Sequence, residues 1–574
     1  MKPCSRRVKR TKADPVLRFF PILTVALLLG PVLAGLLATV LPAFGWFPPL
    51  GGDAFTLEPW RTVLAEPGLA RSAWHSLFSG LLATALSLGI VALFLAGWVG
   101  TPSFRRFTAL VSPLLALPHA AAAFALAFLV APSGWIARLV SPDITGWQRP
   151  PDILVVHDEH ALTLTAALVA KEVPFLLLVA LAALPQTGWE MRLRLATSLG
   201  YGRVRAFLLT VWPALYPQIR LAVFAVLAYS TANVEVAAIL GPLTPPTLAV
   251  RLVDWMGDPD LTRRFAACAG ALLQLGLTVL AGLLWIGGER LGRLWLARAA
   301  PSGRRTRAEG LARSLGAASV ALCAIAILLG LALLALWSVA TFWRFPAALP
   351  DGLTWRTWNR VWPGMSAPFL TTVSVGFASV AAALLLAVGC LEREWRVRSD
   401  GGSRALLVVY LPLIVPQVAF VFGLQLFFLW ARIDASWGAL VLVHLVFVMP
   451  YVFLSLSDPW RAWDTRYASV AHGLGRGEGA VLWRLRLPML VRPLLVAGAV
   501  GFAVSVGQYL PTVLVGAGRL TTITTEAVAL GSGGDRRVIG AWAVIQMVLP
   551  LLAFTLAALV PAILFRHRRA LRTP

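Results

Sequence analysis

Long apolar runs separated by short polar segments recur along the whole chain. A run of about 20 apolar residues is long enough to cross the hydrocarbon core of a membrane as a helix. The pattern predicts an all-α integral membrane protein with about 12 transmembrane helices. We place these helices at residues 18–43, 73–98, 107–131, 161–185, 218–241, 264–287, 314–341, 367–391, 405–430, 437–458, 494–516 and 541–565.

Basic residues gather in alternate segments between the predicted spans. One set of segments, which includes both termini, holds about 33 Lys and Arg, whereas the other set holds about 12. Short loops rich in Lys and Arg stay on the cytoplasmic side of a membrane. We therefore expect both termini to be cytoplasmic, with a basic linker at 289–313 that joins two halves of the chain.

The two halves, 1–288 and 314–574, read as repeats of six spans each in parallel orientation. Several proline, serine and glycine landmarks recur at an offset of 275 or 276 residues, and earlier landmarks recur at about 298. The difference arises from a longer outside loop in the first half. Chance identity between two Leu/Ala-rich halves is the alternative, but it does not explain landmarks that keep register over more than sixty residues.

One basic loop occurs twice, once at 186–217 and once at 459–493. The two copies read Leu195-Ala-Thr-Ser-Leu-Gly200 and Val470-Ala-His-Gly-Leu-Gly475, and a proline follows each glycine thirteen residues later. We expect two short helices in each loop, with a turn at the glycine and the proline ending the second helix. We expect four arginines to meet acidic groups on a partner or lipid headgroups: Arg203, Arg205, Arg484 and Arg486. An ordinary basic loop between spans is the alternative for either copy alone.

This doubled pattern resembles the EAA loop of ABC-importer permeases, in which Glu-Ala-Ala precedes a glycine and a Leu-Pro pair follows at fixed distance. Ala196, Ala471 and the pair Leu487-Pro488 match the motif, as do the spacings from Gly200 to Pro213 and from Gly475 to Pro488. Arg194 and Ser469 stand where the motif has glutamate. The layout is similar to fused two-repeat permeases for thiamine and ferric iron, and further stretches at 241–250 and 524–531 are similar to a Ynj-type inner-membrane permease.

The resemblance implies a permease subunit of a binding-protein-dependent, ATP-driven importer in the bacterial inner membrane. Its partners would be an ATP-binding cassette ATPase dimer and a periplasmic substrate-binding protein. The two loops would then be coupling helices, and a small molecule or ion would be the substrate.

Five polar residues inside the predicted spans are candidates for the translocation path. Lys171 and Glu172 lie near the middle of the fourth span, and an intramembrane charge is costly enough to indicate function or pairing. In the fifth spans, Asn233 and Glu235 match Gln508 and an apolar residue in the second half. The resemblance implies that Asn233 and Gln508 face each other, with Glu235 as a single carboxylate favouring a cation or a proton. Structural pairs and helix ends are the alternatives.

The composition argues against several other functions. The net charge of +24 would suggest nucleic acid on a soluble protein, but membrane topology explains it here, so no nucleic-acid partner is expected. The four lysines follow no Gly-x-x-x-x-Gly, which leaves ATP hydrolysis to a partner. Scattered cysteines and histidines predict no disulfide, metal site or cofactor, and we assign His119, His444 and His472 no role.

Two other classes compete with this interpretation. A secondary active transporter can also have two six-helix repeats, but the Gly-x-x-x-Asp-Arg-x-Gly signature is missing from the loop at 100–106. A membrane-embedded enzyme would need His, Asp or Glu converging from facing spans, and the sequence gives no such cluster.

Overall fold

The computed structural model describes residues 15–301, 303, 305, 309–397, 402–531 and 533–566. Most residues in these ranges are helical, and none of them forms a β-strand. Ten stretches are long and apolar enough to cross a membrane, and two bent helix pairs bring the number to 12 when each pair counts as one span. The prediction of an all-α membrane protein with about 12 spans is therefore confirmed. The predicted position of the chain termini concerns 1–14 and 567–574, which lie outside the described residues.

The first half comprises the following elements: α1 (Pro15–Ala43), η1 (Pro48–Leu50), α2 (Glu58–Ala65), α3 (Leu69–Trp98), α4 (Pro102–Val111), η2 (Ser112–Ala116), α5 (His119–Val130), α6 (Trp135–Leu139), α7 (Leu162–Ala183), η3 (Leu184–Thr187), α8 (Trp189–Ser198), α9 (Arg203–Ala206), η4 (Phe207–Val211), α10 (Trp212–Thr231), α11 (Glu235–Leu240), α12 (Leu248–Met256) and α13 (Arg263–Ala299).

The second half repeats this order with fewer elements outside the membrane: α14 (Gly310–Val339), α15 (Arg356–Val397), α16 (Gly402–Ile414), α17 (Gln417–Trp430), α18 (Trp437–Arg461), α19 (Arg466–Gly473), α20 (Glu478–Val481), η5 (Leu482–Arg486), α21 (Leu487–Met489), α22 (Val491–Val506), α23 (Leu510–Gly516), α24 (Ile523–Gly531) and α25 (Arg536–Leu564). Helix α13 runs eleven residues into the segment predicted as linker.

The third span of each half is broken, although both were predicted as continuous. In the first half Pro118 has extended backbone (ψ 148°) and separates η2 from α5. In the second half Pro416 separates α16 from α17, and the two helices meet at 91°. A proline lacks the N–H that would continue a helix. The matching breaks preserve the repeat.

The fifth span of each half is also broken, which again differs from the prediction. Helix α10 ends before Ala232, and α11 starts at Glu235. Helix α22 ends before Gly507, and α23 starts at Leu510. The short helices that follow, α12 and α24, keep the same offset of 275 residues.

Matching side chains support these breaks in both halves. The first backbone N–H of α12 donates to Ser76 Oγ (3.0 Å), and that of α24 donates to Thr372 Oγ1 (2.9 Å). Gln274 of α13 donates to the carbonyl of Thr231 (3.1 Å), and Gln546 of α25 donates to Thr524 Oγ1 (2.8 Å). Backbone groups freed inside a membrane need partners. Gln274 supplies one at the first break, and Thr524, which donates to the carbonyl of Val506, supplies one at the second.

The halves interdigitate through their first spans. Helix α1 packs along α17, and α14 packs along α5, so each first span lies against the other half. At both crossings a glycine sits where a Cβ would collide with the facing backbone, Gly35 against Phe420 and Gly330 against Ala125. Close approach of this kind needs glycine in membrane helices.

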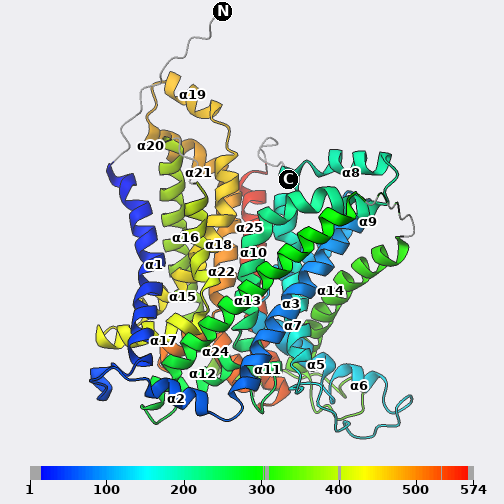
Figure 1. The fold of residues 1–574 in the computed structure, drawn as a ribbon, viewed down its shortest axis with the longest axis vertical. Helices are drawn as coiled ribbons and strands as arrows, with labels where there is room; N and C mark the ends of the chain where they lie inside the picture. Colours follow the sequence, from blue (N-terminus) through cyan, green and yellow to red (C-terminus); the bar gives the residue numbers. More distant parts are fainter. Residues whose placement is uncertain are drawn as a thin grey trace, which may run out of the picture.

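Both repeated loops lie at one end of the molecule. Figure 1 shows α8 and α9 at the upper end, with α19 and α20 also there, whereas α2 and α6 lie at the lower end. The described start of α1 and the described end of α25 are also at the upper end.

Candidate functional site

Each repeated loop forms two short helices joined at a glycine with left-handed backbone. Gly200 has φ +85° between α8 and α9, and Gly475 has φ +75° between α19 and α20. Residues with a Cβ rarely adopt these angles. Ala196 and Ala471, at the matching position on the first short helix, are both buried at 5% exposure. The backbone therefore repeats in register across the two loops.

The proline of the first loop departs from the prediction, whereas the proline of the second loop lies at the end of its helix, as predicted. Pro213 does not end a helix, because Arg203–Thr231 is one continuous span that begins in the loop and runs into the membrane. The prediction for Pro213 is wrong, because a π-helical turn at Phe207–Val211 precedes Pro213 and the helix continues through this proline. Pro488 lies beside Leu487 in α21, and a 71° bend follows before α22.

Apolar side chains project from the first short helix of each loop. Leu195 and Leu199 are 58% and 61% exposed, and Val470 and Leu474, which match them at the offset of 275, are 64% and 75% exposed. Groups of exposed apolar residues on helices outside the spans are typical of surfaces that a partner covers.

The second loop is held to the membrane helices by a buried arginine. Arg486 of η5 is fully buried and donates to Glu392 of α15 at 2.6 Å. Its guanidinium lies 3.7 Å from the ring centroid of Trp395 and 4.3 Å from that of Trp463. A charge this deep needs a counter-ion and aromatic contacts. The prediction that Arg486 meets a partner or lipid is therefore wrong.

The first loop is held by the segment between the halves. Glu309 accepts hydrogen bonds from the backbone N–H groups of Val204 (2.8 Å) and Arg205 (3.0 Å) at the start of α9. The Arg203 side chain donates to the carbonyls of Gly97 and Val99 at the end of α3, contrary to the predicted contact with a partner or lipid. The segment 289–313 therefore supports the first loop as well as connecting the two halves.

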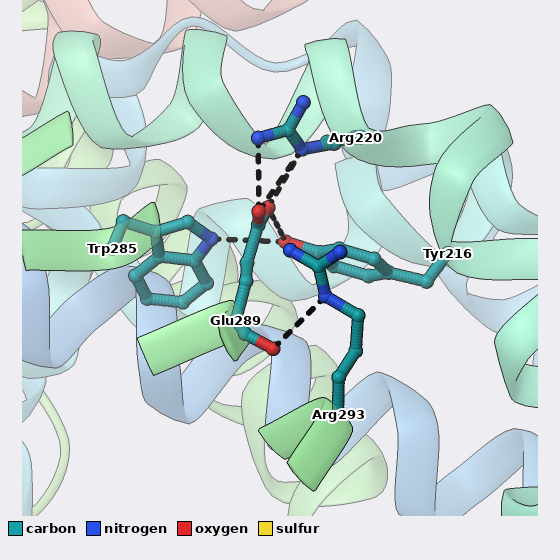
Figure 2. Close-up of polar contacts among 5 residues, drawn as sticks. All are labelled: Tyr216, Arg220, Trp285, Glu289 and Arg293. Carbon is teal, nitrogen blue, oxygen red and sulfur yellow. Dashed lines mark hydrogen bonds and ion pairs between the residues drawn. The ribbon is translucent and has the colours of Figure 1, made fainter. Parts of the chain in front are cut away.

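Helix α10 is fastened to α13 by a group of polar contacts (Figure 2). Glu289 accepts from Arg220 at 2.8 Å and from the Tyr216 hydroxyl at 2.6 Å. Trp285 donates to the same hydroxyl at 3.0 Å, and Arg293 donates to the Glu289 carbonyl at 3.4 Å. These contacts make the upper parts of α10 and α13 one unit.

The polar residues predicted in the first half lie in a buried cluster, but Lys171 and Glu172 have different partners. Lys171 Nζ donates to the carbonyl of Leu114 at 2.8 Å, in the turn before the broken α5. Glu172 Oε1 lies 3.2 Å from Nε2 of His119, the first residue of α5. The His119 ring packs on Tyr229, with centroids 4.6 Å apart.

Glu235 completes the cluster. The Tyr229 hydroxyl donates to Glu235 Oε1 at 2.9 Å, and Glu235 is only 7% exposed. Successive contacts thus run from Glu172 of α7 to His119 of α5, then to Tyr229 of α10 and finally to Glu235 of α11. A buried carboxylate must be hydrogen-bonded, paired or protonated.

Asn233 and Gln508 have separate surroundings. Asn233 Oδ1 accepts from the backbone N–H groups of Val236 (2.8 Å) and Ala237 (3.2 Å), which caps α11. Gln508 is 8% exposed, and its carbonyl accepts from Thr512 Oγ1 at 2.8 Å. That Asn233 and Gln508 face each other around an axis stays a prediction.

Two histidines to which the sequence analysis assigned no role make buried polar contacts at the span breaks. His119 joins the cluster above, and buried His444 lies 2.8 Å from Ser505 Oγ and 3.0 Å from Thr512 Oγ1 at the second fifth-span break. The proline before His119 was the available signal, because it marks a helix start inside an apolar run.

Sequence comparison decides the family. The chain is 32% identical over 555 residues to the inner membrane ABC transporter permease protein YnjC of Escherichia coli (strain K12), covering 96% of this chain and 97% of that protein. The chain belongs to the ABC transporter permeases. It is a multi-pass inner-membrane transport protein and not an enzyme. No family model matches it.

Further permeases are similar over parts of the chain. The spermidine/putrescine transport system permease protein PotC of Haemophilus influenzae is 23% identical over 211 residues, 36% of this chain and 82% of that protein. The molybdenum transport system permease protein ModB of Mycobacterium tuberculosis is 28% identical over 171 residues, 26% of this chain and 64% of that protein. These relatives favour an importer permease over a secondary transporter, and membership implies an ATPase and a substrate-binding protein as partners.

Proposed function

We propose that this permease forms the substrate path of a binding-protein-dependent importer and couples to a separate ATPase dimer through α8 and α19. The observation that carries the proposal is the matched pair of exposed apolar residues on each helix, beside a left-handed glycine. Two such surfaces in one register fit a dimer of ATPase subunits, one surface to each subunit.

Motion at the loops would reach the centre of the membrane by helices. The continuous helix from Arg203 to Thr231 joins the first loop to the break that holds Glu235. In the second loop the buried pair of Arg486 and Glu392 joins η5 to α15. When ATP binding closes the ATPase dimer, the two halves would therefore shift between inward- and outward-facing states. Different ligands would favour each state.

The proposal includes a topology in which the repeated loops and both termini are cytoplasmic. It is supported by the excess of arginine in those segments and by the common end that both loops share in Figure 1. A periplasmic binding protein would then approach the opposite end, near α2 and α6.

The printed names of the relatives do not choose a substrate. One relative is named for spermidine/putrescine transport and another for molybdenum transport. The substrate class must therefore be argued from the residues of this chain.

The coupling proposal is tested by removing the apolar surface. Leu199→Asp with Leu474→Asp should abolish co-purification of the ATPase and substrate-stimulated ATP hydrolysis in proteoliposomes, while leaving membrane insertion unchanged. Each change replaces an apolar contact with a charge that would be buried at the docked surface.

Arg194→Ala is the matched control. Arg194 lies on α8, its side chain is 73% exposed, and it pairs only with Glu190 on the same helix at 3.0 Å. Exposed pairs of this kind contribute about 0–1 kcal/mol, so coupling should stay near wild type. Normal ATPase binding by the double variant would show that the partner docks elsewhere.

A further inference from the structure

One residue takes part in the starts of two helices from different halves. Glu309 immediately precedes α14, and its backbone carbonyl accepts from the N–H of Arg313 at 3.0 Å. Its two carboxylate oxygens accept from the N–H groups of Val204 and Arg205 at 2.8 and 3.0 Å. A carboxylate is stabilised at the positive N-terminal end of a helix. Glu309 therefore joins the start of α9, in the first loop, to the start of α14, in the second half.

Capping alone does not require this arrangement. A short polar side chain just before a helix usually accepts from its first N–H groups, but Gly202 occupies that position before α9 and has no side chain. A serine there would satisfy the same groups locally. The chain instead uses a carboxylate 104 residues away from Arg205. The hydrogen bonds therefore hold two distant segments together as well as capping a helix.

The start of α14 is also fastened to α3 of the first half. Trp98 Nε1 of α3 donates to the carbonyl of Arg313 at 2.9 Å. A Cβ added at Gly316 would lie 2.9 Å from the backbone nitrogen of Phe94, so the two helix backbones are in direct contact. Close packing of this kind transmits displacement because it leaves little room for one helix to slip along the other.

The far end of α14 is fastened to the first half as well. In the segment 340–355, which follows α14, the carbonyl of Ala348 accepts from Trp135 Nε1 at 3.1 Å. The carbonyl of Ala347 accepts from Arg138 of α6 at 2.9 Å. Helix α14 is thus held by the first half at both ends, and 340–355 connects it to α15.

We propose that Glu309 is a positioning residue that links the first loop to α14, so that a push on this loop also displaces the first span of the second half. The inference rests on the proposed coupling function, and it names a residue through which one loop acts on both halves. The helix that begins at Arg203 carries the push into the first half, and Glu309 carries it into α14. The second loop is anchored within its own half, by Arg486 and Glu392.

Hydrogen–deuterium exchange of the detergent-purified full chain tests the contact itself. Glu309→Ala should raise the exchange rates of the Val204 and Arg205 amides about tenfold or more, which corresponds to ~1.4 kcal/mol. Glu309→Asp keeps the carboxylate on a shorter side chain and should raise them less. Glu190→Ala is the matched control, because Glu190 is a carboxylate on α8 that pairs with Arg194 of the same helix. Its exchange at α9 should equal that of wild type.

A second arm separates the link from simple capping. Gly202→Ser combined with Glu309→Ala should return exchange at α9 close to wild type, because the serine hydroxyl caps α9 locally, but it does not restore the link to α14. Exchange is then compared for the complex of the full chain and the ATPase with and without Mg-ATP and vanadate. In wild type and Glu190→Ala, ATP should change exchange in the first loop and at 340–355. In the double variant the change at 340–355 should be lost, while that in the first loop remains.

Either arm can overturn the proposal. Wild-type exchange at α9 in Glu309→Ala would show that the carboxylate does not hold the loop. No response to ATP at 340–355 in wild type, or a response there that survives in the double variant, would show that the link transmits nothing. If the double variant does not fold, Glu309→Ala alone decides in the ATP comparison. The first arm contains no ATPase, so it stands even if the ATPase docks elsewhere, and failure of the link leaves docking at α8 and α19 untouched.

Discussion

Gly475→Val isolates the backbone requirement of the second coupling loop. Gly475 has φ +75°, and no atom lies within 4 Å of the position that a Cβ would occupy. The substitution therefore introduces backbone strain without a collision. An L-residue in the left-handed region costs about 1–2 kcal/mol, and a β-branched side chain adds to this cost. Gly200→Val would not isolate the backbone strain, because the added Cβ would also come within 3.3 Å of Arg305.

A strain of about 2 kcal/mol would lower the population of the correctly turned loop about 30-fold. We expect substrate-stimulated ATP hydrolysis in proteoliposomes to fall by a similar factor, provided that docking requires the turn. The level of permease in the membrane should not change, since Gly475 itself is exposed and the added side chain would meet no other part of the protein. Basal hydrolysis by the free ATPase should also stay constant.

Gly473→Val provides the matched control two residues away. Gly473 ends α19, lies outside the positive-φ glycines, and also has no atom within 4 Å of a Cβ. It should couple within about threefold of wild type, because valine is slightly favoured over glycine in a helix. Equal loss in both variants, or normal coupling in Gly475→Val, would refute the role of the left-handed turn.

Two further predictions concern topology and the buried arginine. Ser198→Cys should react with an impermeant maleimide only in inside-out vesicles, and Asp152→Cys only in intact cells; the reverse pattern would invert the topology. Arg486→Met should destabilise the protein by roughly 3–5 kcal/mol, because Glu392 loses a buried counter-ion. Exposed Arg484→Met should leave the unfolding temperature in detergent unchanged, and adding Glu392→Gln to Arg486→Met should recover part of the loss; no recovery would mean that the pair is not the cause.

The sequence predicted the spans and the repeat because both are properties of local composition. Apolar length determines where a helix crosses the membrane, and glycine and proline landmarks keep register because they mark turns. The breaks in the third and fifth spans were missed, since hydropathy averaged over twenty residues does not register a two-residue interruption. Pro118 and Pro416 carried the signal for the third spans, but a proline also occurs within intact helices such as α7, at Pro174.

The candidate site was predicted only in part. Lys171, Glu172 and Glu235 stand out because charges are rare in apolar runs. Their partners could not be predicted, since His119 and Tyr229 come close to them only through the folding of α5 and α10. The prediction for Arg486 was wrong for a related reason. The sequence does not distinguish an exposed loop arginine from a buried one, and only the fold brings Glu392 of α15 next to Arg486.

The two repeats have similar backbone arrangements but carry different buried polar residues. The first half holds the buried carboxylates Glu172 and Glu235, whereas the second half holds the buried His444 beside its own fifth-span break. The mechanical connections differ as well, because the first loop continues as one helix to Thr231, whereas a 71° bend separates the second loop from α22. An equal push on both loops must therefore act most directly on the break beside Glu235.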